Sequence, residues 1–81
     1  MLTNVRIVLI SPSGPANIGA ACRAMANMGL SELVIVAPRC AVDDEVAVAY
    51  ATHGVEILHA ARVVADIPAA LAGCVRSYAT S

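Results

Sequence analysis

The stretch that decides the fold is Val5-Arg-Ile-Val-Leu-Ile10, followed directly by Ser11-Pro-Ser-Gly-Pro-Ala16. The first run is apolar and β-branched, which is typical of a strand buried on both faces of a parallel sheet. The second run is a loop, because its prolines and its glycine interrupt the pattern. Asn17 is the expected cap of a following helix, since its side chain can accept a hydrogen bond from the first turn. The apolar stripe of that helix consists of Ile18, Cys22 and Met25.

The alternation of strand and helix continues along the rest of the chain. Gly29 is the expected end of the first helix, with Leu30 folding back as its hydrophobic contact. Further strands are predicted at 33–37, 61–65 and 74–80, and further helices at 46–52 and 67–71. The acidic triplet at 43–45 favours the start of the first of these helices, and Asp66 is the expected cap of the second. The sequence therefore predicts a Rossmann-like parallel sheet with flanking helices.

Composition excludes several classes of protein. The 81 residues are 59% hydrophobic with a mean hydropathy of +0.77, whereas disordered segments combine low hydrophobicity with high net charge. Charged residues, proline or glycine interrupt each apolar stretch before it reaches the ~20 residues that a membrane span needs. The first residues lack the apolar core of a secretory signal. We therefore expect a cytoplasmic α/β domain.

Charge and cysteine usage limit the kinds of site that the chain can form. The net charge is −1, and all five basic residues are arginines. Phosphate contacts supply most of the affinity of nucleic-acid binders, so any such role must depend on particular arginines. The three cysteines form no CxxC pair, and neither histidine lies at ligand spacing from one of them. We therefore expect reduced thiols and no metal site.

The segment Gly14-Pro-Ala-Asn-Ile-Gly-Ala-Ala21 matches neither of two common phosphate-binding motifs. Gly14 and Gly19 have the spacing of a P-loop, but Ala20 and Ala21 stand where that motif requires Lys and Ser or Thr. The dinucleotide fingerprint GxGxxG is absent as well. Nucleotide hydrolysis by a P-loop and dinucleotide binding are therefore excluded.

Asn17, Gly19 and Arg23 are the candidate functional residues of the first helix. Glycine weakens a helix relative to alanine, so at Gly19 we expect the backbone to approach another group closely. Arg23 lies one turn later on the same side, away from the apolar stripe, and is predicted to point back toward the loop, where Asn17 can orient it. From the spacing alone, a solvent-exposed arginine and an asparagine that only caps the helix are the favoured interpretation.

The run Pro-x-Asn-Ile-Gly-Ala-x-x-Arg-Ala-Met-x-Asn-Met-Gly-Leu, which ends at Leu30, resembles motif 1 of the SpoU branch of SPOUT RNA 2′-O-methyltransferases, the TrmJ-type tRNA enzymes in particular. A weaker likeness continues through 33–38 and 69–74. The resemblance implies transfer of a methyl group from S-adenosylmethionine to a ribose 2′-hydroxyl of RNA, with tRNA as the expected substrate. It also implies that Arg23 is catalytic and that Asn17 helps to hold it. Ser11 and Ser13 are further candidates for RNA contact.

The resemblance also implies that residues 1–81 form the N-terminal part of an α/β knot domain and lack the C-terminal trefoil knot. The knot holds the cofactor in that family, so no residue here is assigned to S-adenosylmethionine, and the full-length protein is expected to be a homodimer. Arginine is a poor base in proteins, so we expect Arg23 to grip a phosphate and orient the hydroxyl. Two alternatives remain open: a non-catalytic RNA-binding or interaction module of the same fold, and a small flavodoxin-like regulatory domain.

Overall fold

The computed structural model describes residues 5–71 and 76–80, with side chains over the first of these ranges. The elements follow the order β1 (Val5–Ile10), α1 (Pro15–Asn27), β2 (Glu32–Val36), α2 (Glu45–Ala51), a 3-10 turn η1 (Thr52–Gly54), α3 (Val55–Ala60), β3 (Arg62–Val64), α4 (Ile67–Leu71) and β4 (Arg76–Thr80). Each predicted strand is present: β1 has the predicted bounds, β2 and β3 differ from theirs by one residue at each end, and β4 ends at the predicted residue. Residues 74 and 75 of the fourth predicted strand lie outside the described residues.

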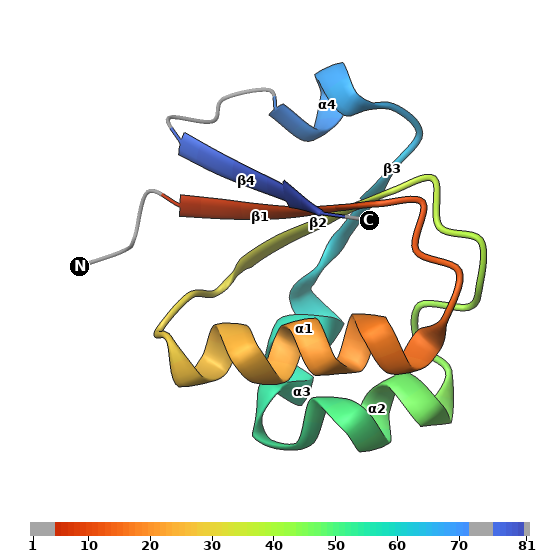
Figure 1. The fold of residues 1–81 in the computed structure, drawn as a ribbon, viewed down its shortest axis with the longest axis vertical. Coiled ribbons are helices and arrows are strands. Elements are labelled where there is room, and N and C mark those ends of the chain that lie inside the picture. Colours follow the sequence, from red (N-terminus) through yellow and green to blue (C-terminus); the bar gives the residue numbers. More distant parts are fainter. Residues whose placement is uncertain (1–4, 72–75, 81) are drawn as a thin grey trace.

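The four strands form one parallel sheet in the order β3-β2-β1-β4. In Figure 1, α1, α2 and α3 lie on one side of the sheet and α4 lies on the other. This arrangement confirms the predicted Rossmann-like sheet with flanking helices. The chain leaves β1 through a helix on one face and reaches β4 through a helix on the other, so the carboxyl ends of β1 and β4 form a topological switch point. Open α/β sheets bind ligands at such points.

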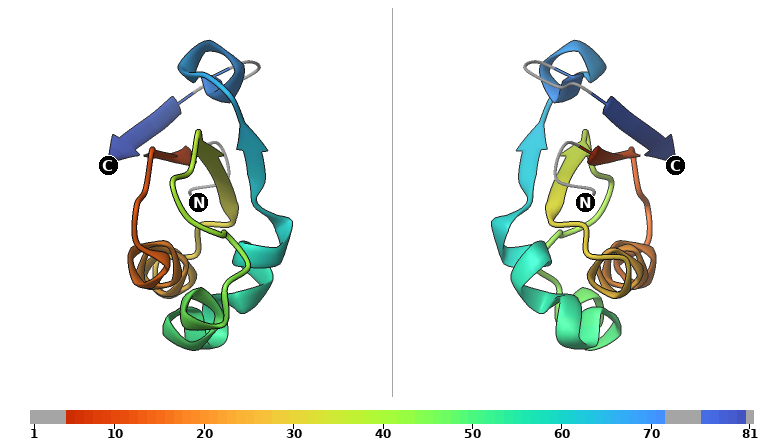
Figure 2. Two further views of the ribbon diagram at one scale, coloured as in Figure 1. Left: turned by 90° about the vertical axis from the view of Figure 1, so that its right-hand side faces the viewer. Right: turned by 90° about the vertical axis from the view of Figure 1, so that its left-hand side faces the viewer.

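The two faces of the sheet bury separate apolar clusters, because alternate residues of a strand point to opposite sides. Figure 2 shows the helical layer of α1, α2 and α3 packed beneath the sheet. The cluster on that side includes Leu9 and Ile35 from the sheet and Ile18 and Cys22 from α1. The smaller cluster, on the side of α4, consists of Val8, Val34, Val36 and Ala70.

The first helix ends as predicted. Gly29 has a φ of 74°, the left-handed conformation that glycine adopts without a steric penalty. The N–H of Leu30 donates to the carbonyl of Met25 over 2.9 Å, and the N–H of Gly29 donates to that of Ala26 over 3.3 Å. Leu30 is buried. These contacts make a Schellman motif, which fixes the direction in which the chain enters β2.

The start of the first helix differs from the prediction. The helix begins at Pro15, Gly14 is its N-cap, and no side chain caps it. Asn17 is therefore the third residue of the helix and not its cap. Proline is well suited to the first helical position, since its φ is preset and its missing N–H has no helical partner there. This preference explains why the helix starts two residues earlier than Asn17.

One helical segment was not predicted. The sequence predicts a helix at 46–52 and no further helix before the strand at 61–65, whereas the structure continues through η1 into α3, which contains His59. Gly54 is buried at this junction against α1, and a Cβ atom there would lie 2.6 Å from the carbonyl carbon of Cys22. The close approach allows α3 to pack beside α1, a contact between segments far apart in the sequence.

Candidate functional site

The carboxyl edge of the sheet carries two strained turns. Ser11, directly after β1, has a φ of 48°, and Ala37, directly after β2, has a φ of 44°. The N–H of Ser11 donates to the carbonyl of Val36 over 2.7 Å, and the N–H of Ala37 donates to that of Val64 over 2.9 Å. These bonds continue the strand pairing into the loops and hold both residues in a conformation that costs of order 1 kcal/mol. Such strain is concentrated at ligand-binding sites.

Pro12 joins the loop after β1 to the loop after β2. Its carbonyl accepts a hydrogen bond from the N–H of Arg39 over 2.8 Å and a weaker one from the Cys40 thiol, with 3.7 Å between sulfur and oxygen. Pro12 is buried, while Ser11 and Ser13 on either side of it are exposed. Ser11 and Ser13, the predicted RNA-contact residues, therefore lie on a loop that is held by hydrogen bonds at the carboxyl edge of the sheet.

Gly19 is the point at which α1 meets α2. A Cβ atom on Gly19 would lie 2.7 Å from Cβ of Tyr50 and 2.9 Å from the amide nitrogen of Ala51, and closer still to the carbonyl oxygen of Ala47. These distances leave no room for a side chain. The group that the backbone of Gly19 approaches is thus a neighbouring helix within the chain.

Asn17 and Arg23 are both exposed, but they lie on different flanks of α1. The amide nitrogen of the Asn17 side chain reaches toward Gly14, 3.9 Å from the place a Cβ atom would take there. Within residues 5–71, no hydrogen bond or ion pair joins Asn17 to Arg23. Residues six positions apart in a helix are separated by about 9 Å along the axis and about 120° around it. The predicted orienting contact between them is therefore absent, and the Asn17 side chain extends from the first turn of α1 toward Gly14 in the loop.

Arg23 emerges beside the junction of α1 with η1. On the same side of the helix, the Asn27 side-chain oxygen accepts a hydrogen bond from His53 Nε2 over 2.8 Å, while His53 Nδ1 lies 3.2 Å from the Thr52 hydroxyl. The backbone nitrogen of Arg23 lies against Gly54. The helix is thus fixed on both sides of Arg23, while the guanidinium itself is exposed.

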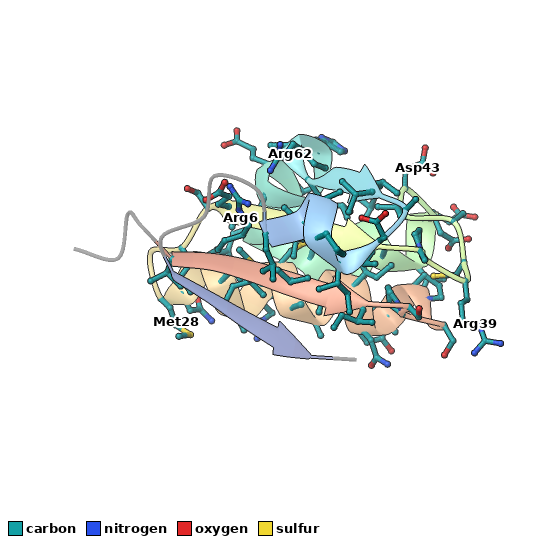
Figure 3. All side chains as sticks on the ribbon, turned by 90° about the horizontal axis from the view of Figure 1, so that it is seen from above. Arg6, Met28, Arg39, Asp43 and Arg62 are labelled. Atoms are coloured by element: carbon teal, nitrogen blue, oxygen red, sulfur yellow. The ribbon has the colours of Figure 1, made fainter. Side chains whose placement is uncertain are left out.

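Arg6 has a structural role, and it lies near the amino end of β1, away from the carboxyl edge of the sheet. It is only 6% exposed, although it lies within β1. One guanidinium nitrogen donates to the carbonyl of Ala70 over 2.7 Å, and another pairs with the Glu32 carboxylate over 2.7 Å. Arg6 therefore ties α4 and β2 to β1 near the amino end of the sheet, where Figure 3 shows it. A guanidinium engaged in this way does not take part in phosphate binding.

The thiols and the acidic side chains form no metal site in the part of the chain that the structure describes. Burial raises the pKa of Cys22 to about 11, which keeps it a neutral thiol. Cys40 is half-buried, and Cys74 lies outside the described residues. Over the described ranges, no group of three or more His, Cys, Asp or Glu side chains is placed to hold a metal ion. Nor does any helix there have the length and apolarity needed to span a membrane.

The SpoU rRNA Methylase family matches residues 4–81. The chain belongs to this family. A relative from Pseudomonas aeruginosa, named tRNA (cytidine/uridine/adenosine-2′-O-)-methyltransferase TrmJ, is 51% identical over 74 residues, which are 91% of this chain and 28% of the relative. The tRNA (cytidine/uridine-2′-O-)-methyltransferase TrmJ of Sodalis glossinidius is 43% identical over 81 residues, which are 100% of this chain and 31% of the relative.

A solved structure supports the same assignment. The crystal structure of TrmJ from Z. mobilis ZM4 superposes with a TM-score of 0.81 at 38% identity, covering 86% of this chain and 31% of that one. The chain spans about a third of the length of the curated relatives that it matches. The family match over residues 4–81 includes β1, the loop after it and α1, the segment that resembles motif 1.

Arg39 also lies at the carboxyl edge of the sheet, and the sequence did not indicate this position. It is exposed, and it lies near the loop of Ser11 and Ser13 because of the bond from its N–H to Pro12. Only the parallel pairing of β1 with β2, which aligns their carboxyl ends, indicates this proximity. A hydrogen bond between two loops that are far apart in the sequence cannot be predicted from the spacing of nearby residues.

Proposed function

We propose that the full-length polypeptide containing residues 1–81 is a tRNA ribose 2′-O-methyltransferase that uses S-adenosylmethionine and acts as a cytoplasmic homodimer. The main support is the match of residues 4–81 to the SpoU methylases, together with relatives that are named as tRNA 2′-O-methyltransferases. The sheet order supports it as well, because the loop between β1 and α1 lies beside a switch point that suits ligand binding.

Arg23 is the residue to which we assign the central role. The motif-1 arginine is catalytic in the family that the sequence resembles, and Arg23 occupies that position. Its side chain is exposed and makes no ion pair within residues 5–71, so its charge is available to an RNA phosphate. A guanidinium can hold a phosphate with two parallel hydrogen bonds and thereby orient the neighbouring ribose hydroxyl. In this role Arg23 positions the nucleophile.

Asn17 and the serines act at the loop. Asn17 reaches toward Gly14, so we assign it to the RNA-facing surface of the loop, where it supports substrate binding without touching Arg23. The exposed hydroxyls of Ser11 and Ser13 can donate to phosphate or ribose oxygens. These contacts fix the register of the RNA rather than read its bases.

S-adenosylmethionine is implied by the family as the methyl donor. The described residues do not fit it: adenine sites are clefts lined mainly by apolar side chains, whereas Ser11, Ser13 and Arg39, which are exposed at this edge, are polar or charged. We therefore assign none of these residues to the cofactor.

The test is methyl transfer by the complete reading frame that contains residues 1–81. Unmodified tRNA transcript and isotopically labelled S-adenosylmethionine are incubated with the protein, and the digested nucleosides are analysed by mass spectrometry. The proposal predicts a nucleoside that carries the label on its ribose. A transcript with a 2′-deoxy nucleotide at the modified position is the control and accepts no label. Label on a base, or RNA binding without transfer, contradicts the proposal, and the second outcome supports the non-catalytic alternative.

A further inference from the structure

The five arginines of the chain lie at very different places in the fold. Three belong to the amino ends of strands: Arg6 in β1, Arg62 in β3 and Arg76 in β4. Arg23 lies in the second half of α1. Arg39 alone follows the carboxyl end of a strand, in the loop after β2. Among the described residues, the loops at the carboxyl edge of the sheet therefore contain one arginine, Arg39.

The backbone at Arg39 is fixed while its side chain extends into solvent. Its N–H donates to the carbonyl of Pro12 over 2.8 Å, and the thiol of the next residue, Cys40, lies 3.7 Å from the same oxygen. The left-handed turn at Ala37 sets the direction of the chain just before it. Figure 3 shows the Arg39 side chain projecting from this end of the molecule. When the backbone of a residue is held in place, less conformational entropy is lost as its side chain binds a ligand.

The acidic residues that follow do not neutralise Arg39. Asp43, Asp44 and Glu45 come four to six residues later, but within residues 5–71 none of them forms an ion pair with it. Asp44 is engaged elsewhere, because its carboxylate accepts the N–H of Val46 over 2.8 Å. The backbone of Arg39 is thus bonded to the loop that carries Ser11 and Ser13, and its exposed guanidinium forms no ion pair within residues 5–71.

We propose that Arg39 is a positioning residue that binds a phosphate of the RNA backbone at the carboxyl edge of the sheet. The proposal rests on the proposed function and extends it by naming a second cationic contact, separate from Arg23. Because the net charge of the chain is −1, its hold on RNA depends on individual guanidinium groups. The forked guanidinium suits a phosphate oxygen pair, and the serines complete the polar surface.

The test compares Arg39→Gln with Arg62→Gln in the complete reading frame. Arg62 is also exposed but lies at the amino end of β3, so it controls for the loss of one positive charge. Binding of unmodified tRNA transcript is measured over a series of salt concentrations, and methyl transfer is measured as kcat and KM for the RNA. Arg39→Lys keeps the charge without the fork and is the third variant.

For Arg39→Gln we expect the Kd and the KM for RNA to rise by about three- to tenfold, with kcat at saturating RNA within twofold of wild type. The slope of log Kd against log salt falls by about 0.7 to 0.9, the value for one phosphate contact. Arg39→Lys restores the slope, and Arg62→Gln leaves both slope and Kd unchanged.

Three outcomes overturn the assignment of Arg39. These are an unchanged slope and Kd in Arg39→Gln, equal effects of Arg39→Gln and Arg62→Gln, and a loss of kcat without a change in RNA binding. If wild type methylates RNA and Arg39→Gln behaves like it, only this inference fails. If wild type neither binds nor methylates RNA, the proposed function fails and the inference falls with it.

Discussion

Gly19 shows how much one missing side chain matters at the scale of a residue. Glycine normally weakens a helix interior by about 1 kcal/mol relative to alanine, so an isolated helix would gain from Gly19→Ala. In this fold the added methyl would meet Tyr50 Cβ at 2.7 Å and the backbone of α2. Backbone atoms of a packed helix cannot move aside cheaply. The tertiary cost therefore exceeds the local gain.

We predict that Gly19→Ala lowers the free energy of unfolding by about 2–3 kcal/mol, the usual cost of overpacking. Urea unfolding of the wild type and the variant measures the difference. Gly14→Ala is the matched control, because the nearest atom to a Cβ there is 3.9 Å away, and it should change stability by less than about 1 kcal/mol. A Gly19→Ala variant more stable than wild type would show that α1 and α2 do not pack this closely.

Cys22 predicts a pH dependence of stability. Burial raises the pKa of its thiol from the ordinary 9.0 to about 11, so the folded state keeps the proton that the unfolded state loses. Stability from this group is complete below pH 9 and declines as the pH rises from 9 toward 11. Urea midpoints between pH 8 and 10.5 should fall more steeply for wild type than for Cys22→Ala. Cys40→Ala, at a half-buried thiol, is the control and should keep the steep fall; identical slopes for all three proteins would exclude the effect.

Two helix ends illustrate the scale of the element. The chain enters α2 through Asp44, whose carboxylate accepts the N–H of Val46, and the chain leaves α1 through the Schellman turn at Gly29. Both depend on a single residue type at a single position. The acidic start and the glycine stop are local features, so the sequence alone predicted both.

We predict that Asp44→Ala destabilises the protein by about 1 kcal/mol through loss of the cap. Asp43→Ala removes the same charge one residue earlier, from a side chain that makes no hydrogen bond within residues 5–71, and should have less than half the effect. Thermal unfolding at moderate salt compares the two. Equal destabilisation would mean that the charge near the helix start matters and the hydrogen bond does not.

Elements that depend on distant contacts were harder to predict than those that depend on local pattern. The β-branched run of β1 indicated a buried strand correctly, and the Asp66 cap of α4 is present, with its carboxylate 2.9 Å from the N–H of Ala69. The helix α3 was missed because it is short and its packing depends on the approach of Gly54 to Cys22. The predicted start of α1 was wrong because the helix begins at Pro15, a residue well suited to the first helical position, and not after Asn17.

For the whole molecule, the sheet order brings together residues that the sequence separates. The roles of Ser11, Ser13 and Arg23 stay predictions, and all three side chains are exposed. Within residues 5–71, no hydrogen bond joins Asn17 to Arg23, so the predicted contact between these two side chains is absent there. Arg39 was missed because its place beside Pro12 follows from the pairing of β1 with β2. The burial of Arg6 likewise required knowledge of α4, which supplies the Ala70 carbonyl.

The central claim is that the guanidinium of Arg23 acts on the RNA substrate and does not merely keep α1 soluble. The most direct measurement compares Arg23→Ala with Arg62→Ala in the complete reading frame, recording methyl transfer to tRNA and, by calorimetry, the affinity for S-adenosylmethionine. We predict that Arg23→Ala lowers the transfer rate by about a hundredfold or more, while cofactor affinity stays within twofold and Arg62→Ala behaves like wild type. Full transfer activity in Arg23→Ala, or an equal loss of transfer and cofactor binding, would contradict the account.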